Sequence, residues 1–128
     1  MTSIRYIELK SGYTDNGPAW IARVAESRSG RTLYFNGMAL KRVAGVVGNH
    51  IDSATGAEYW VSGVKKRGTN RHWAGSGKIL VEAAAVPDLL AVLGEEALDT
   101  NVFAVTHKIK PTSPAEFVAR ENAPLRNP

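Results

Sequence analysis

The dipeptide Asn36-Gly37, set between two short apolar runs, constrains the fold of this chain more than any other feature. Both residues tolerate the positive φ angles of a type I′ turn, whose twist matches that of two antiparallel strands. The flanking runs, residues 32–35 and 38–41, contain residues that suit strands. The sequence therefore predicts a β-hairpin over residues 32–41.

Similar strand candidates occur through the first 82 residues. They cover residues 4–9, 20–24, 58–64 and 78–82, with a short return strand at 71–74. Turn-forming stretches such as SGYTDNGP at 11–18 separate them. Alternation within 58–64 places Tyr59 and Val61 on one face, and Trp60 and Ser62 on the other. We interpret residues 43–56 as a loop, because they hold three glycines and a turn-forming segment at 52–56.

One helical pattern follows the strands. Val86, Leu89, Leu90 and Leu93 are spaced i, i+3, i+4, i+7 and form one apolar face, and Gly94 suits the end of a helix. We expect a helix near residues 86–98 and a last strand within 101–108. Hairpins followed by one helix describe an α+β domain: a small curved antiparallel sheet, or an SH3-like partial barrel, with one covering helix.

The length of 128 residues suits one domain. Residues 1–108 are predicted to form a single strand-rich domain, and residues 109–128, with four prolines, a C-terminal tail. The absence of cysteine excludes disulfides and thiolate chemistry. No apolar run approaches the ~20 residues of a membrane span, and none resembles the core of a signal peptide. We expect a cytoplasmic protein without membrane contact.

Charge is distributed unevenly around a net value of +4. Residues 27–51 contain four cations and no acid, and residues 59–81 contain five cations and no acid. Residues 82–107 contain five acids and neither Lys nor Arg. Such asymmetry attracts a polyanion or reflects complementarity within the fold. Both interpretations stay open at this point.

The segment SGVKKRGTNRHWAG, residues 62–75, is the main functional lead. Clustered Lys and Arg neutralise phosphates, and exposed aromatic rings stack on single-stranded bases. The alternative is that the tryptophans are core residues and the cations solubilise a turn. The predicted nucleic-acid or partner contacts are Lys65, Lys66, Arg67, Arg71, His72, Trp73 and Lys78.

Catalytic, cofactor and metal motifs are weak. Gly75-Ser76-Gly77-Lys78 resembles the end of a phosphate-binding loop, but His72 and Ile79 occupy required positions, which favours a tight turn. Nothing in the spacing of the three histidines makes them converge with Asp52 on a metal. No serine lies in a nucleophile elbow. We expect no catalytic residue, cofactor or metal site.

Three stretches carry a family resemblance: ELKSGYTDNGPAWIARV, GRTLYFNGMAL and TGAEYWVSGVKKRGTNRHWAGSGK. They resemble a family of small bacterial proteins over about residues 6–103. The family has no established activity, so the resemblance implies no catalytic residues. Some similar proteins carry the label 1-deoxy-D-xylulose-5-phosphate synthase. We reject it, because that enzyme is much larger and its Gly-Asp-Gly cofactor motif is absent here.

The sequence supports three hypotheses of function. The first is a non-enzymatic binding module that contacts nucleic acid, RNA or single strands rather than duplex, through the basic aromatic hairpin. The second is a protein-interaction module (an inhibitor, immunity or accessory protein) that docks on a bacterial partner, with the acidic segment 82–99 as a contact surface. The third is a small enzyme with its site near His72.

Overall fold

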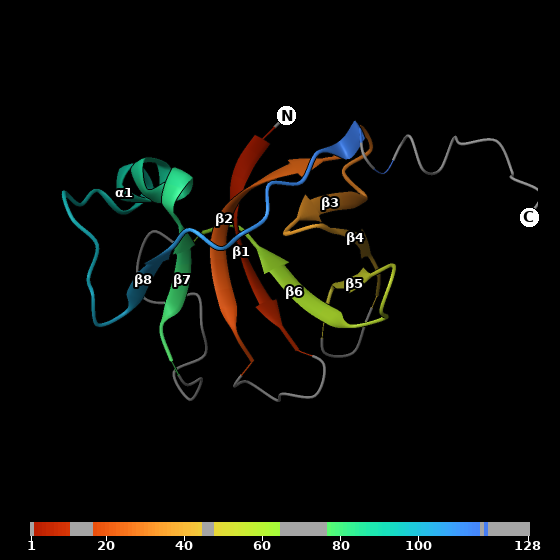
Figure 1. Ribbon diagram of the computed structural model, residues 1–128, viewed down its shortest axis with the longest axis horizontal. Coiled ribbons are helices and arrows are strands. Elements are labelled where there is room, and N and C mark those ends of the chain that lie inside the picture. Colours follow the sequence, from red (N-terminus) through yellow and green to blue (C-terminus); the bar gives the residue numbers. More distant parts are fainter. Residues whose placement is uncertain (1, 11–16, 45–47, 65–76, 116, 118–128) are drawn as a thin grey trace, which may run out of the picture.

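The computed structural model describes residues 2–10, 17–44, 48–64, 77–115 and 117 (Figure 1). Their strands are β1 Thr2–Leu9, β2 Ala19–Glu26, β3 Thr32–Phe35, β4 Met38–Arg42, β5 His50–Asp52, β6 Glu58–Ser62, β7 Ile79–Glu82 and β8 Phe103–Thr106. Between β7 and β8 lie the 3-10 helix η1 Ala83–Ala85 and the α-helix α1 Val86–Leu93.

Strands β1 to β6 form a closed antiparallel barrel. Each strand pairs with the next one in the sequence, and β6 pairs back onto β1, with Tyr6 opposite Ser62 and Leu9 opposite Tyr59. Closure removes the unpaired edges that an open sheet of these strands would have. The predicted small antiparallel barrel with one helix is confirmed, and the closer likeness to an SH3 barrel stays a prediction.

Strand β2 connects the barrel to strands β7 and β8, which belong to the same sheet. One edge of β2 pairs with β1 over its length, while the other edge pairs with β3 near Glu26 and with β7 near Trp20. The β2–β7 and β7–β8 pairs are parallel, so β7 and β8 extend the sheet away from the barrel (Figure 1). The parallel β7–β8 connection requires a crossover, which η1 and α1 supply.

Strand alternation divides the apolar residues into two cores. Inward positions fill the barrel, including Ile7, Val24 and Leu40. The opposite faces of β1 and β2 contribute Tyr6 and Ile21 to an outer core that contains Ile79, Val81 and Leu89. A six-stranded barrel is narrow enough for its interior to be filled by side chains. The interior of the barrel is therefore filled by side chains.

The Asn36-Gly37 hairpin is confirmed and closes one end of the barrel. Asn36 has φ 49° and Gly37 φ 78°, as a type I′ turn requires. The segment after β8 crosses to this hairpin (Figure 1). There the Lys110 N–H donates to Asn36 Oδ1 over 2.9 Å, and the Gly37 N–H donates to the Thr112 hydroxyl. Ile109 packs against the interior core at the same end.

Two predictions about elements were wrong. Residues 43–56 are not only a loop, because β5 His50–Asp52 lies there and pairs with β4 and β6. The helix does not reach residue 98. It ends at Leu93, because Gly94 turns into the left-handed region at φ 69° and its N–H closes the last turn on the Leu90 carbonyl.

Candidate functional site

At the end of the barrel opposite the Asn36-Gly37 hairpin, the inward positions of the strands hold ionisable residues instead of apolar ones. Alternation continues from Ile7 to Arg5 on β1, from Val24 to Glu26 on β2 and from Leu40 to Arg42 on β4. His50 on β5 lies opposite Arg42 in the strand pairing. Charged side chains are rarely placed inside a barrel, but here they lie at its mouth, where water reaches them.

A cavity of about 320 Å³ opens at this mouth. It is at the small end of the range of about 300–1,000 Å³ that is usual for ligand sites. All six barrel strands or the turns next to them contribute to its lining. The lining residues are Arg5, Glu26, Gly30, Leu33, Arg42, Asn49, His50, Val61, Ser62 and Gly63.

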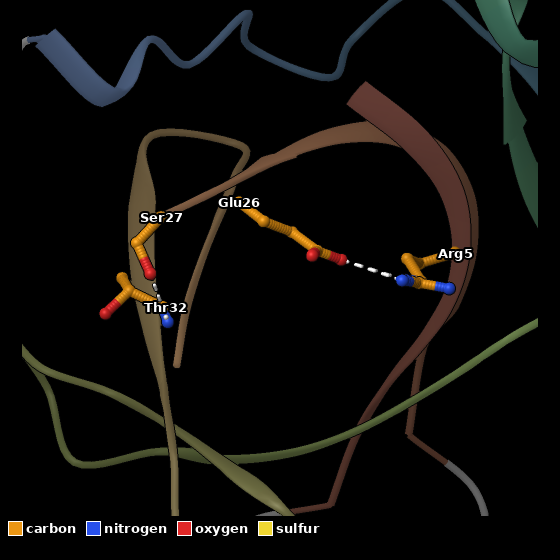
Figure 2. Close-up of polar contacts among 4 residues, drawn as sticks. All are labelled: Arg5, Glu26, Ser27 and Thr32. Atoms are coloured by element: carbon orange, nitrogen blue, oxygen red, sulfur yellow. Dashed lines mark hydrogen bonds and ion pairs between the residues drawn. The ribbon is translucent and has the colours of Figure 1, made fainter. Parts of the chain in front are cut away.

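An ion pair occupies one wall of the cavity. Arg5 Nη2 donates to Glu26 Oε1 over 2.8 Å, and Arg5 Nε lies 3.3 Å from the same oxygen. Figure 2 shows the two side chains pointing toward each other from β1 and β2. Each side chain is about one-third exposed, so water screens the attraction between the two charges. The ion pair therefore contributes little to stability. Its consequence for a ligand is that the Arg5 charge is already compensated.

Asn49 and His50 form the opposite wall. The Val61 N–H donates to Asn49 Oδ1 and Asn49 Nδ2 donates to the Val61 carbonyl, both over 2.7 Å. A backbone N–H only donates and a carbonyl only accepts, so these two bonds fix the orientation of the amide. His50 Nδ1 lies 2.9 Å from the same Oδ1. Because that oxygen is an acceptor, Nδ1 carries the proton of the neutral imidazole, and Nε2 carries the lone pair.

His50 is nearly buried, with 8% of its surface exposed. Burial lowers the pKa of the imidazole below its usual value, the Arg42 cation lowers it further, and the Glu26 carboxylate acts in the opposite direction. The ring is therefore neutral at pH 7. A neutral ring with Nδ1 protonated presents an acceptor, not a charge, to the cavity.

A second hollow, of about 470 Å³, adjoins the first at Arg42. Its lining is Ser29, Arg31, Arg42, Val43 and Ala44. Ser29 and Arg31 are positioned by the turn between β2 and β3. In that turn the Ser27 N–H donates to the Thr32 carbonyl over 2.8 Å and the Thr32 N–H donates to the Ser27 hydroxyl over 3.1 Å (Figure 2).

The two hollows together form a cationic barrel end, which we define by Arg5, Glu26, Arg31, Arg42 and His50. Among the residues that the structure describes, Arg31 and Arg42 form no ion pair. Among the described residues that line the two hollows, Glu26 is the one carboxylate, and it is paired with Arg5. Two uncompensated guanidinium groups therefore remain, and an anion is the ligand that they favour.

The predicted contact residues are mostly outside the described part of the chain. This applies to Lys65, Lys66, Arg67, Arg71, His72 and Trp73. Lys78 is described and is exposed directly before β7. The predicted alternation in β6 is confirmed: Tyr59 is buried in the barrel core, whereas Trp60 is 42% exposed. Of these two aromatic residues, Trp60 is the one that a ligand can reach.

The cationic barrel end itself was missed in the sequence. Its residues lie on strands that are far apart along the chain, and closure of the barrel brings them together. One signal was present, because Arg31 and Arg42 belong to the acid-free segment 27–51. His50 is one of the three histidines that the sequence offers as metal ligands together with Asp52. In the structure Asp52 accepts hydrogen bonds from the Ala54 N–H and the Thr55 hydroxyl within its own turn.

The buried carboxylate of Glu8 lies outside this site. Glu8 is 2% exposed on the outer face of β1, where it accepts a hydrogen bond from the Tyr6 hydroxyl. Lys10 Nζ lies 2.8 Å from Glu8 Oε2. The ion pair with Lys10 offsets part of the cost of burying the carboxylate. We therefore assign it a structural role.

Comparison with protein-family models, curated proteins and solved structures gave no match. In the part of the chain that the structure describes, no three His, Asp or Glu side chains gather as metal ligands would. No helix within the described ranges has the length and apolarity to cross a membrane.

Proposed function

We propose that this protein is a non-enzymatic module that binds nucleic acid, RNA or single strands in preference to duplex DNA. The observation that carries the proposal is the cationic barrel end, where Arg31 and Arg42 flank two adjoining hollows and the Arg5 charge is compensated by Glu26. Arginine binds phosphate oxygens through a planar fork of donors, and several such contacts along a strand give affinity without a deep pocket.

An exposed aromatic side chain supports a preference for single-stranded nucleic acid over duplex DNA. Trp60 projects from the outer face of β6, and β6 leads directly into the basic segment that starts at Lys65. Unpaired bases stack on such rings, which bases inside a duplex cannot do. Arg28, exposed in the β2–β3 turn, adds a further charge near the barrel end.

Binding is favoured over catalysis by the contacts within the cavity. The Ser62 hydroxyl, which lines the first hollow, donates to the neighbouring Gly63 carbonyl over 3.2 Å. His50 Nδ1 is bound to Asn49. A nucleophile activated by histidine would need its hydroxyl bonded to the ring. The Ser62 hydroxyl is bonded to Gly63 and not to the His50 ring, which supports a site that holds a ligand rather than one that attacks it.

The test is fluorescence anisotropy with labelled single-stranded RNA, single-stranded DNA and duplex DNA. Arg31→Gln and Arg42→Gln remove cations from the barrel end, and a fourfold Ala variant at Lys65, Lys66, Arg67 and Arg71 removes the basic segment. Lys108→Gln, at an exposed site after β8, is the matched loss of one charge. We expect RNA binding that weakens with salt and in both groups of variants, with Lys108→Gln close to wild type. Absence of binding at low salt contradicts the proposal.

A protein-interaction module is the second candidate. Strand β8 ends the sheet, and its Val105 is 49% exposed. An edge strand can accept a strand from a partner, with side-chain contacts adding specificity. Val105→Lys would weaken a protein complex and leave RNA binding unchanged. The opposite pattern, in which only the arginine variants lose binding, favours nucleic acid.

A further inference from the structure

The mouth cavity carries two different ligand groups side by side. Arg42 supplies a charge that no described acid compensates by an ion pair, and His50 supplies an uncharged acceptor. Both face the same space of about 320 Å³, since both line it and they are opposite each other in the β4–β5 pairing. A site that only neutralised the charge of an anion would not need the uncharged acceptor of His50.

The acceptor is held in place by a fixed chain of hydrogen bonds. Val61 orients Asn49, Asn49 accepts the proton of His50 Nδ1, and the lone pair is thereby left on Nε2. Among the described residues Nε2 has no hydrogen-bond partner, yet it is not one of the atoms sealed from solvent. A ligand that enters the cavity can therefore reach it. Preorganisation of this kind reduces the entropy that binding costs.

We propose that the mouth cavity binds a sugar phosphate monoester, with the phosphate against Arg42 and a sugar hydroxyl donating to His50 Nε2. This inference rests on the proposed function, since the terminal nucleotide of a strand is one source of that group. A free nucleoside monophosphate is the other source. The small volume suits one nucleotide unit, whereas the second hollow at Arg31 leaves room for the strand to continue.

A phosphate monoester is favoured over the phosphodiester of an internal nucleotide. The monoester carries up to two negative charges and three free oxygens, and as the end of a strand it can enter the mouth cavity from one side. An internal diester has chain on both sides and fits an open groove. Arg5, already bonded to Glu26, lies in the wall and keeps the charge of that wall near zero, so Arg42 determines where the phosphate binds.

The experiment compares strands that differ only at their ends. Single-stranded RNA oligomers carry either a 5′-phosphate or a 5′-hydroxyl, with the label at the 3′ end, and a second pair reverses the ends. Adenosine monophosphate competes as the free nucleotide, and inorganic phosphate is the probe for the anion alone. Wild type is compared with Arg42→Gln and with Lys41→Gln, which removes the neighbouring charge from the outward face of β4.

We expect the phosphorylated end to raise affinity about tenfold, since a charge-assisted hydrogen bond is worth roughly one factor of ten. Arg42→Gln should abolish this increment, and Lys41→Gln should preserve it. His50→Phe keeps a ring but removes the acceptor, and should weaken adenosine monophosphate about fivefold, with inorganic phosphate unchanged. Circular dichroism of each variant verifies that the barrel is folded.

The outcomes show whether this inference fails, the proposed function fails, or both fail. Equal binding of phosphorylated and unphosphorylated RNA overturns the inference and leaves the proposed function standing. Adenosine monophosphate binding without any oligomer binding supports the inference, identifies the free nucleotide as the source and overturns the proposed function. Binding of neither ligand overturns both. An increment that survives in Arg42→Gln also overturns the inference, because the phosphate would then be bound elsewhere.

Discussion

Asn49 links two strands and orients the histidine beside it. Its amide replaces a stretch of strand pairing, because it bonds to both the N–H and the carbonyl of Val61 on β6. The backbone N–H of the same residue donates to the Tyr59 carbonyl over 2.9 Å. One residue thus bonds to three backbone groups of β6, two through its side-chain amide and one through its backbone N–H.

We therefore expect Asn49→Ala to lower the free energy of unfolding by about 1–3 kcal/mol, from two lost hydrogen bonds of about 0.5–1.5 kcal/mol each. Urea denaturation measures the change. Asn101→Ala, at an exposed position after α1, is the control and should stay within about 0.5 kcal/mol of wild type. Equal stability of the two variants would show that the Asn49 bonds do not hold β5 to β6.

His50 should make the stability of the fold depend on pH. Its folded pKa is lowered, first by burial and then by Arg42, with Glu26 opposing. As the pH falls below about 6.5, the unfolded chain takes up a proton that the folded barrel resists. The free energy of unfolding therefore decreases until the lowered folded pKa is reached, and it is fully restored above the unfolded pKa.

Thermal melts between about pH 5 and pH 7.5 measure this loss, in a range mostly above the usual titration of carboxylates. His50→Gln should flatten the acid side of the profile, whereas His107→Gln, at an exposed site, should leave it unchanged. If wild type and His50→Gln lose stability in parallel, another group causes the acid loss.

At the scale of elements, prediction succeeded where the local pattern was strong. The Asn36-Gly37 turn, the alternation of Tyr59, Trp60 and Val61, and the start of the helix at Val86 all depend on neighbouring residues. Strand β5 has no such signal. It is three residues long, and its inward positions hold His50 and Asp52 in place of apolar residues. Its pairing with β4 and β6 decides its conformation.

Gly48 explains how β5 approaches β6 so closely. A Cβ atom at this position would lie 2.6 Å from the Tyr59 carbonyl oxygen and 3.0 Å from its nitrogen. Both atoms are backbone, so neither can rotate away. The glycine next to Asn49 and His50 thus permits the contact that closes this side of the barrel.

Gly48→Ala should force β5 away from β6 and cost about 1–3 kcal/mol, the usual range for overpacking. Differential scanning calorimetry gives the change, and the imidazole signals of His50 in NMR spectra report whether the ring is displaced. Gly63→Ala, whose Cβ would meet nothing within 4 Å, serves as the control and should be near neutral. A stable Gly48→Ala variant with an undisturbed His50 would contradict this explanation.

At the scale of the whole molecule, closure of the barrel produces the site. Arg5, Glu26, Arg42 and His50 are spread over 46 positions of the sequence, from residue 5 to residue 50, and converge because β6 pairs back onto β1. Local patterns do not report such long-range pairing, so the small barrel could be predicted but not the mouth cavity. The charge pattern located the site only coarsely. The acid-free segment 27–51 contributes Arg31 and Arg42 to the cationic barrel end and Arg28 close to it, whereas its Lys41 lies on the outward face of β4.

The most direct test of the cationic barrel end is the salt dependence of single-stranded RNA binding. For single strands, each phosphate neutralised by a cation contributes about 0.7 to the slope of log K against log salt. The Arg31→Gln, Arg42→Gln double variant should therefore reduce the slope by about 1.4, and Lys108→Gln should leave it unchanged. A double variant with the wild-type slope, or a wild-type protein that binds no RNA at low salt, would contradict the account.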